Sequence, residues 1–221
     1  MYADSVVKQS VVHPPAIAID VIDRFVKVAE QEAATHQAGH LECEYEQALS
    51  SLATHMLIRR NLYPPWEGLQ QWLQTDQSAD VDAIRELCRL GKICRINSRS
   101  GENHFEFRHD RILEHFLARA MQVMLAEWTL NANVLADPFY ASYLGRALAF
   151  HQPSDDLLNW VRLNAPLALI ASLRFLPVLP SAIADRMAMD AKQWLEAASK
   201  DKSTPPTLLF ESYRLLEEID S

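Results

Sequence analysis

The sequence predicts a mainly α-helical fold that is interrupted once by a β-hairpin, and three observations lead to this prediction. Apolar residues recur every three to four positions through most of the 221 residues, which is the period of an α-helix. The period changes to two only after Gly91, where two short strands are expected. Glycine is scarce, with 5 residues, and several of the 11 prolines stand where a helix can begin.

Four helices are expected before the hairpin. Residues 1–13 have no clear period and are interpreted as a lead-in. The segment 38–40, the proline-containing turn 61–65 and the polar connector 76–80 separate the helices, and Gly91 is expected to end the last of them. The expected helices are residues 16–35, 41–60, 66–74 and 81–90.

The hairpin is expected at residues 93–96 and 104–107, where apolar and polar side chains alternate. The seven residues between these strands include Gly101 and are predicted to form the turn. A long amphipathic helix then begins at Asp110 and ends near residue 129, with its apolar side chains again at three- and four-residue spacing.

Three helices, a hairpin and a helix are the order of a winged-helix domain with one β-hairpin wing. Beyond it only helices are expected, at residues 138–150, 154–161, 165–176, 181–199 and 205–219. They show no repeat of fixed period, so a HEAT-like and an irregular α-helical array both remain open. Residues 1–40 are therefore assigned to a lead-in and linker helix, 41–129 to the winged helix and 130–221 to the array. The array aromatics Trp160, Phe175, Trp194 and Phe210 are expected in its core.

Composition and charge restrict the class of protein. Hydrophobic residues make up 49% and charged residues 23%, which is ordinary for a globular domain, and no apolar run is long enough to span a membrane. The net charge of −8 counts against nucleic acid as a partner, because phosphate neutralisation needs a positive surface. Three cysteines at unrelated spacings and the absence of a signal peptide pattern lead us to expect a cytoplasmic location.

No catalytic or metal-binding motif is found. A P-loop requires G-x-x-x-x-G-K-[ST], whereas Gly91-Lys92 is followed by Ile93 and lacks the preceding glycine. His109 and His115 are six residues apart, which is not the i,i+4 spacing of two zinc ligands on a helix. A metal phosphohydrolase of the histidine–aspartate type would place its doublet within helices, whereas His109-Asp110 directly follows a strand. We therefore expect no enzyme activity of this chain by itself.

The junction between the second strand and the long helix resembles the winged-helix segment of the STAND NTPases, which include the NACHT and NB-ARC proteins. In that family the last strand runs into a helix with the pattern Phe-x-His-Asp, followed by Glu-aromatic-x-x-Ala. The matching residues here are Phe107-Arg108-His109-Asp110 and Glu114-His115-Phe116-Leu117-Ala118. Position 115 is His where the family often has Tyr, a departure that we expect to affect packing.

The resemblance implies a regulatory role. His109 would sense nucleotide by contacting the β-phosphate of ADP, Asp110 would cap the helix, and Arg108 and Arg111 would contact phosphate or a partner. ADP or ATP would bind only in the context of a full-length NTPase, whose P-loop ATPase core lies in the same polypeptide or an adjacent protein. The helical array would receive a sensor or trigger protein. On residue types alone, His109-Asp110 is better interpreted as a simple helix cap, and only the surrounding pattern favours the sensor.

Two other functions stay open, a winged-helix DNA-binding transcriptional regulator and a protein-interaction scaffold. A winged helix reads DNA with its third helix, here residues 81–90, whose exposed face would carry Asp82, Arg85, Glu86 and Arg89. These four residues are better interpreted as a solvated face of paired charges. Arg95, Arg99 and Arg108 on the wing leave non-specific binding open.

Overall fold

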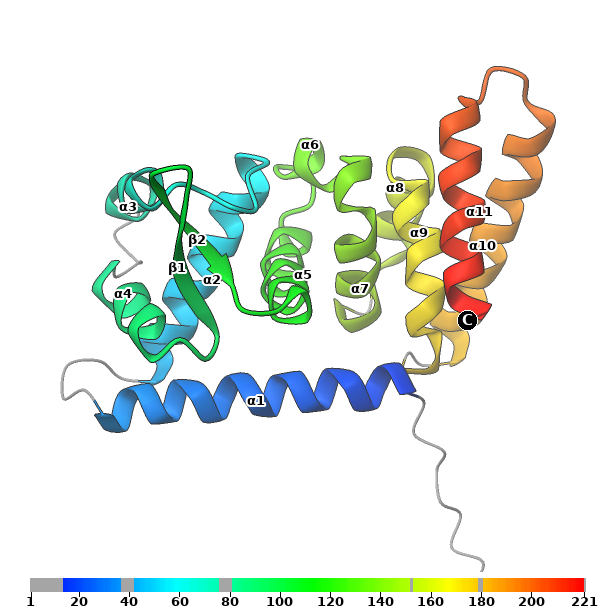
Figure 1. Ribbon diagram of the computed structural model, residues 1–221. Coiled ribbons are helices and arrows are strands. Elements are labelled where there is room, and N and C mark those ends of the chain that lie inside the picture. Colours follow the sequence, from blue (N-terminus) through cyan, green and yellow to red (C-terminus); the bar gives the residue numbers. More distant parts are fainter. Residues whose placement is uncertain (1–13, 37–41, 76–80, 152, 179–180, 221) are drawn as a thin grey trace, which may run out of the picture.

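The computed structural model describes residues 14–36, 42–75, 81–151, 153–178 and 181–220, and within them the chain is mainly helical with one two-stranded antiparallel hairpin (Figure 1). The mainly α prediction is thereby confirmed. The predicted lead-in 1–13, the break 38–40 and the connector 76–80 lie outside the described residues. None of the helices in these ranges combines the length and the apolar character that a membrane span needs.

The elements of the N-terminal half lie within a few residues of their predicted bounds. Helix α4 shows why, since its buried Ala83, Ile84 and Leu87 form one stripe and Gly91 ends it with a positive φ of 64°. The Gly91 amide then donates to the carbonyl of Leu87 at 3.0 Å. The helices are α1 (Pro14–His36), α2 (Glu42–Ile58), α3 (Trp66–Thr75), α4 (Val81–Leu90) and α5 (Asp110–Ala126).

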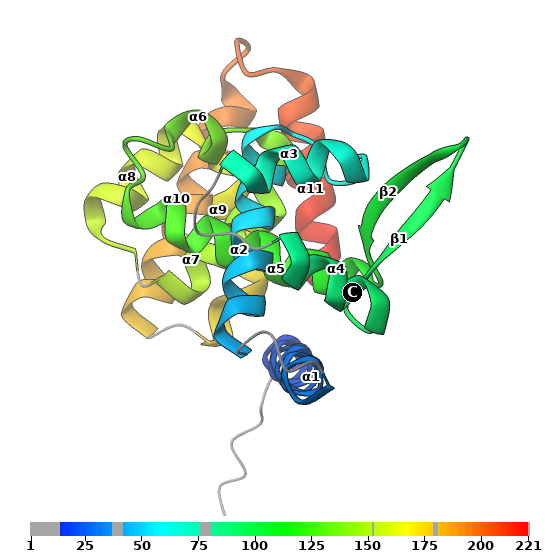
Figure 2. The same ribbon diagram turned by 90° about the vertical axis from the view of Figure 1, so that its left-hand side faces the viewer.

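The hairpin is longer and its turn tighter than the sequence predicted. Strands β1 (Cys94–Arg99) and β2 (Glu102–Phe107) pair over six residues each, so the predicted seven-residue turn is wrong. Ser100 and Gly101 alone make the turn, with φ of 52° and 87°, as a two-residue hairpin turn with both central residues left-handed requires. The outer half of both strands is exposed and polar, which hides its alternation in the sequence. Figure 2 shows the hairpin projecting from the helical body.

The described residues of the C-terminal half form only helices and the turns and loops between them, and two of the predicted helices begin or end as 3₁₀ turns. The segment before α7 is a 3₁₀ turn in which the carboxylate of Asp137 accepts a hydrogen bond from the amide of Phe139 at 3.0 Å. Helix α6 was not predicted, since four residues are too few to show a period. The elements are α6 (Ala132–Leu135), η1 (Pro138–Tyr140), α7 (Ala141–His151), α8 (Asp155–Asn164), α9 (Pro166–Ser172), η2 (Leu173–Val178), α10 (Ser181–Lys200) and α11 (Pro206–Asp220).

One cluster of buried side chains runs from α2 through α5 and α7 to α9. Trp160, Phe175 and Trp194 pack against this core as predicted, but Phe210 is 67% exposed, so its prediction as a core residue is wrong. Phe210 lies on the outer face of the last helix, where no later element of the described chain covers it.

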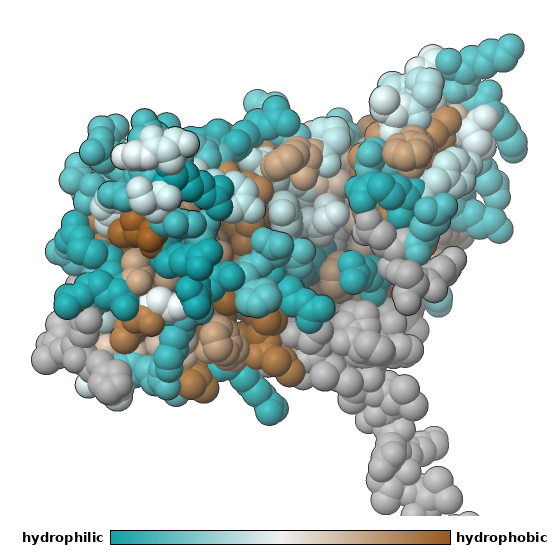
Figure 3. Space-filling view, in the orientation of Figure 1, coloured by the Kyte–Doolittle hydropathy of each residue, from teal (hydrophilic) through white to brown (hydrophobic). Residues whose placement is uncertain are grey.

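Helix α1 lies across the base of the molecule and contacts α2, α4 and α5 as well as η2 (Figure 1). Its Val26, Ala29 and Ala33 are buried against these elements, whereas Val21, Phe25 and Val28 are exposed. The apolar residues of this helix therefore lie on two faces, one buried and one exposed. Figure 3 shows apolar surface along the lower edge of the molecule, where α1 lies.

Candidate functional site

The residue predicted to sense nucleotide, His109, occupies the N-cap position of α5, directly after β2. Its backbone is extended, with φ of −145° and ψ of 141°, and its carbonyl accepts hydrogen bonds from the amides of Ile112 and Leu113 at 3.0 and 3.1 Å. The imidazole makes no capping hydrogen bond and is exposed. The main chain of His109 therefore begins the helix, and its side chain is left available to a ligand.

The backbone on both sides of His109 is well supported. The Phe107 ring stacks on the ring of Phe116 with 5.3 Å between centroids, and the Arg108 amide donates to the carbonyl of Ile93 at 2.8 Å. The first contact joins β2 to α5, and the second closes the base of the hairpin immediately before the exposed histidine. The junction consequently presents the imidazole from a fixed main chain.

The other three predicted site residues surround His109 and are all exposed. Asp110 is the first residue of α5, one position beyond the N-cap, where its charge is favourable to the positive end of the helix dipole. The guanidinium groups of Arg108 and Arg111 form no hydrogen bond or ion pair within the described residues. The structure thus brings the four predicted residues to one exposed corner.

The faces that would contact DNA are largely occupied by internal contacts. Glu86 was predicted to be exposed, but it is half-buried and accepts a hydrogen bond from the Tyr45 hydroxyl at 2.6 Å, so that prediction is wrong. Asp82 and Arg85 form the predicted ion pair on α4. Arg89 is exposed on the same helix.

The wing arginines are held by a buried carboxylate. Glu106 on β2 is only 5% exposed, and it pairs with Arg95 and, at 2.8 Å, with Arg99 on β1. Burial raises the pKa of Glu106, and the hydrogen bond and charge of Arg95, with the charge of Arg99, outweigh this and leave the pKa below its ordinary value. These arginines are therefore committed to the hairpin itself.

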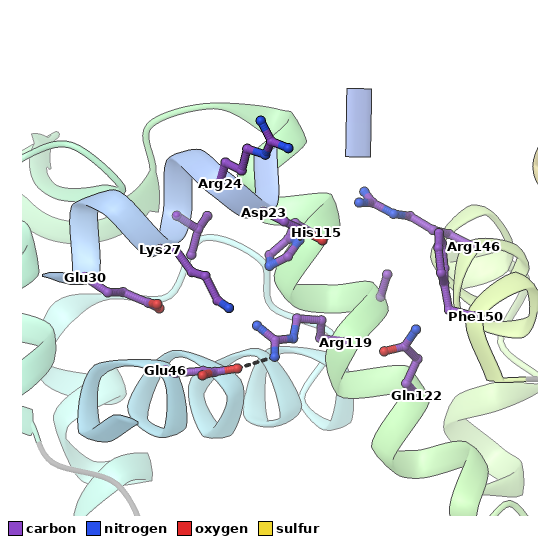
Figure 4. A pocket seen from close by; sticks show the side chains of 12 residues that line it. Asp23, Arg24, Lys27, Glu30, Glu46, His115, Arg119, Gln122, Arg146 and Phe150 are labelled. Carbon is purple, nitrogen blue, oxygen red and sulfur yellow. Dashed lines mark hydrogen bonds and ion pairs between the residues drawn. The ribbon is translucent and has the colours of Figure 1, made fainter. Parts of the chain in front are cut away.

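A cleft of about 530 Å³ lies between α1, α2, α5 and α7 (Figure 4). Sequence reasoning missed it, because its residues come from helices that are far apart in the chain. The protein has a net charge of −8, but among the charged side chains that line the cleft the basic ones outnumber the acidic ones. The lining residues that carry charge or hydrogen-bonding groups are Asp23, Arg24, Lys27, Glu30, Glu46, His115, Arg119, Gln122 and Arg146.

Two contacts organise the charges of the cleft. The Nδ1 atom of the buried His115 on α5 lies 2.9 Å from a carboxylate oxygen of Asp23 on α1, and Arg119 pairs with Glu46 on α2. The hydrogen bond from His115 lowers the pKa of Asp23, although partial burial opposes it. His115 thus does more than pack, the only effect that the sequence predicted for it. A histidine within the apolar stripe of residues 110–129 was the available signal.

Within the described residues no group of three or more His, Cys, Asp or Glu side chains is placed to hold a metal ion. Comparison of the chain with protein-family models, with curated proteins and with solved structures gives no match. The case for a function therefore depends on the residues and on the geometry described above.

Proposed function

We propose that this chain is the regulatory winged-helix and helical module of a STAND-type ATP/ADP-gated signalling or defence NTPase in the cytoplasm. The module closes over ADP and relays a sensor signal, and it is not catalytic by itself. The order α2, α3, α4, β1, β2, α5 supports the winged-helix assignment, because three helices, a hairpin and a helix follow one another with the expected spacing.

The exposed imidazole of His109 is the observation that carries the proposal. It stands at the N-terminus of a 17-residue helix, where free amide groups and the helix dipole favour an anion. An imidazole that does not cap its own helix can donate a hydrogen bond to a phosphate oxygen, and Arg108 and Arg111 add positive charge beside it. The P-loop ATPase core, in the same polypeptide or an adjacent protein, supplies the rest of the nucleotide site.

The helices after α5 are proposed to receive the sensor or trigger protein. On α11, Phe210 and Tyr213 are exposed by 67% and 52% and lie three residues apart, on one face of the helix. Adjacent exposed aromatic side chains are favourable for protein contact. Binding at this end would act on nucleotide by changing how the module closes over the ATPase core.

The test is the rate of ADP release from the ATPase core that this chain regulates, measured with a fluorescent ADP analogue. His109→Ala removes the phosphate contact, so ADP is expected to leave about tenfold faster, in keeping with the loss of one charge-assisted hydrogen bond. His151→Ala, on α7, is the matched control and leaves the rate unchanged. Equal release from wild type and His109→Ala excludes the sensor role.

The second candidate function, a winged-helix DNA-binding regulator, is favoured only by the projecting hairpin and the exposed Arg89 (Figure 2). A salt titration of DNA binding separates it from the first. DNA binding that weakens steeply with salt would support the regulator, and the absence of such binding leaves the nucleotide-gated module or a protein-interaction scaffold.

A further inference from the structure

The inner end of the cleft between α1, α2, α5 and α7 contains a buried imidazole with only one of its two nitrogens bonded. Nδ1 of His115 contacts Asp23, whereas Nε2 is buried and has no hydrogen-bond partner within the described residues. Leaving a buried polar atom without a partner costs about 1–3 kcal/mol. In Figure 4 the ring lies between Lys27 and Arg119 on one side and Arg146 on the other.

Arg146 also lacks a hydrogen-bond partner in the described chain, and its guanidinium carries a full positive charge. It is largely buried, and burial lowers the pKa of its guanidinium, although the charges of Glu114 and Asp23 oppose this. No hydrogen bond or ion pair involves the guanidinium within the described residues, and Figure 4 shows it reaching from α7 toward α1. Lys27, on α1, likewise forms no ion pair among these residues. Two cations that form no ion pair in the described chain, Arg146 and Lys27, therefore line the same cleft as the imidazole of His115, which Asp23 contacts.

Two of the three carboxylates that line the cleft make their closest contacts with residues other than Arg146 and Lys27. Asp23 is engaged by His115, and Glu46 by Arg119. Glu30 and Glu46 lie on the opposite side of the cleft from Arg146 in Figure 4. Over the whole lining, the four cations exceed the three carboxylates by one, and His115 lies among them.

We propose that this cleft binds the phosphate group of a small phosphorylated molecule. Arg146 donates its fork of N–H groups, Lys27 adds a point charge, and His115 donates from Nε2 when both ring nitrogens carry a proton. A phosphate monoester carries a charge of about −1.5 to −2 and three acceptor oxygens, which suits three separate donors better than a single carboxylate does. The volume of about 530 Å³ leaves space for the remainder of the molecule beside Gln122 and Phe150.

The test uses the complete chain with inorganic phosphate as the probe, at constant ionic strength maintained with sodium chloride. Wild type is expected to show a saturable rise in Tm and saturable heat in calorimetry. Arg146→Met and Lys27→Met are expected to weaken phosphate binding about tenfold or more. Arg89→Met removes the same charge from an exposed position on α4, outside the cleft, and is expected to bind phosphate as wild type does.

Stability without phosphate separates a ligand site from a structural one. Because Arg146 has no partner in the described part of the chain, Arg146→Met is expected to be as stable as wild type or more stable in sodium chloride alone. If Arg146→Met does not fold, the phosphate response of Lys27→Met, at an exposed position, tests the proposal instead. The proposal is overturned by a Tm that does not respond to phosphate, by an unchanged response in these variants, or by an equal response to succinate, which would assign the cleft to carboxylates.

This inference does not rest on the proposed nucleotide function, and the two experiments can fail separately. Arg146→Met is read out with inorganic phosphate on this chain, whereas His109→Ala is read out as ADP release from the ATPase core. Loss of the phosphate response with normal ADP release would confirm the cleft as a site of its own.

Discussion

The carboxylate of Asp23 on α1 lies 2.9 Å from the imidazole Nδ1 of His115 on α5. This contact joins the long N-terminal helix to the central helix. The histidine is buried and the carboxylate is half-exposed, so the pair closes the inner wall of the cleft. Among the described side chains of α1, the buried apolar ones are Val26, Ala29 and Ala33, so this polar contact contributes to the position of the helix.

We predict that Asp23→Asn lowers stability by about 1 kcal/mol at pH 7, since it replaces a charged acceptor by a neutral one at a partly solvated position. The folded state lowers the pKa of Asp23, so its contribution is complete above the ordinary pKa of about 4 and disappears as the pH falls through the lowered value. Urea unfolding between pH 7 and pH 3 measures this. The two proteins should converge toward acid pH, and a difference that grew toward acid would contradict the assignment.

Glu106→Gln is predicted to destabilise the hairpin by about 2 kcal/mol, because it weakens two charge-assisted hydrogen bonds to a buried acceptor. The variant also releases Arg95 and Arg99, so non-specific DNA binding at low salt should increase. Glu102→Gln, on the same strand but with its side chain 74% exposed, is the control and should change neither property. Unfolding curves and a low-salt DNA titration give both readouts.

Gly145→Ala is predicted to destabilise the packing of α7 on α9. A Cβ there would lie 2.8 Å from the carbonyl oxygen of Ala168, from the Cβ of Ala171 and from the amide nitrogen of Ser172, and two of these are main-chain atoms that cannot rotate away. We expect a loss of about 1–3 kcal/mol, as for overpacked cores.

Gly68→Ala provides the opposite case for the same substitution. Nothing lies within 4 Å of a Cβ at Gly68, which is inside α3, so alanine is expected to stabilise the helix by about 0.5–1 kcal/mol. Thermal unfolding of both variants is the measurement. Equal effects of the two substitutions would refute the close approach of α7 and α9.

Tyr140→Phe is predicted to cost about 1 kcal/mol. The Tyr140 hydroxyl is buried and donates to the carbonyl of Leu57 at 3.1 Å, at the C-terminal end of α2, where this carbonyl also accepts from the amide of Arg60 at 3.2 Å. Hydrogen exchange of the last turn of α2 should quicken in this variant. Tyr213→Phe, on the exposed face of α11, should leave exchange and stability unchanged.

Local patterns were sufficient for most of the secondary structure and insufficient for the cleft. Helix α4 was predicted at its observed bounds because its apolar stripe and Gly91 both act within a few residues. The length of the hairpin was missed, because Asn97, Ser98 and Arg99 are polar on both faces of an exposed strand. Only their pairing with Glu102, Asn103 and His104 of β2 makes these residues part of a strand.

The candidate site divides in the same way. His109 was found from a local motif, and its exposure at the start of α5 is compatible with the predicted role. His115 and Arg146 were not recognised as a site, because what they share is a position in space that depends on how α1 crosses α5 and α7. Long-range packing of this kind leaves no period in the sequence.

The crossing of α1 has a mechanical consequence. This helix contacts α4 near the hairpin and η2 near the last helices, so any rotation of one end against the other must slide or detach it. The work of that rotation then includes breaking the contact between Asp23 and His115. A phosphate held by Lys27 of α1 and Arg146 of α7 would link the two helices and oppose this rotation. Dissociation of the phosphate would then make the rotation easier.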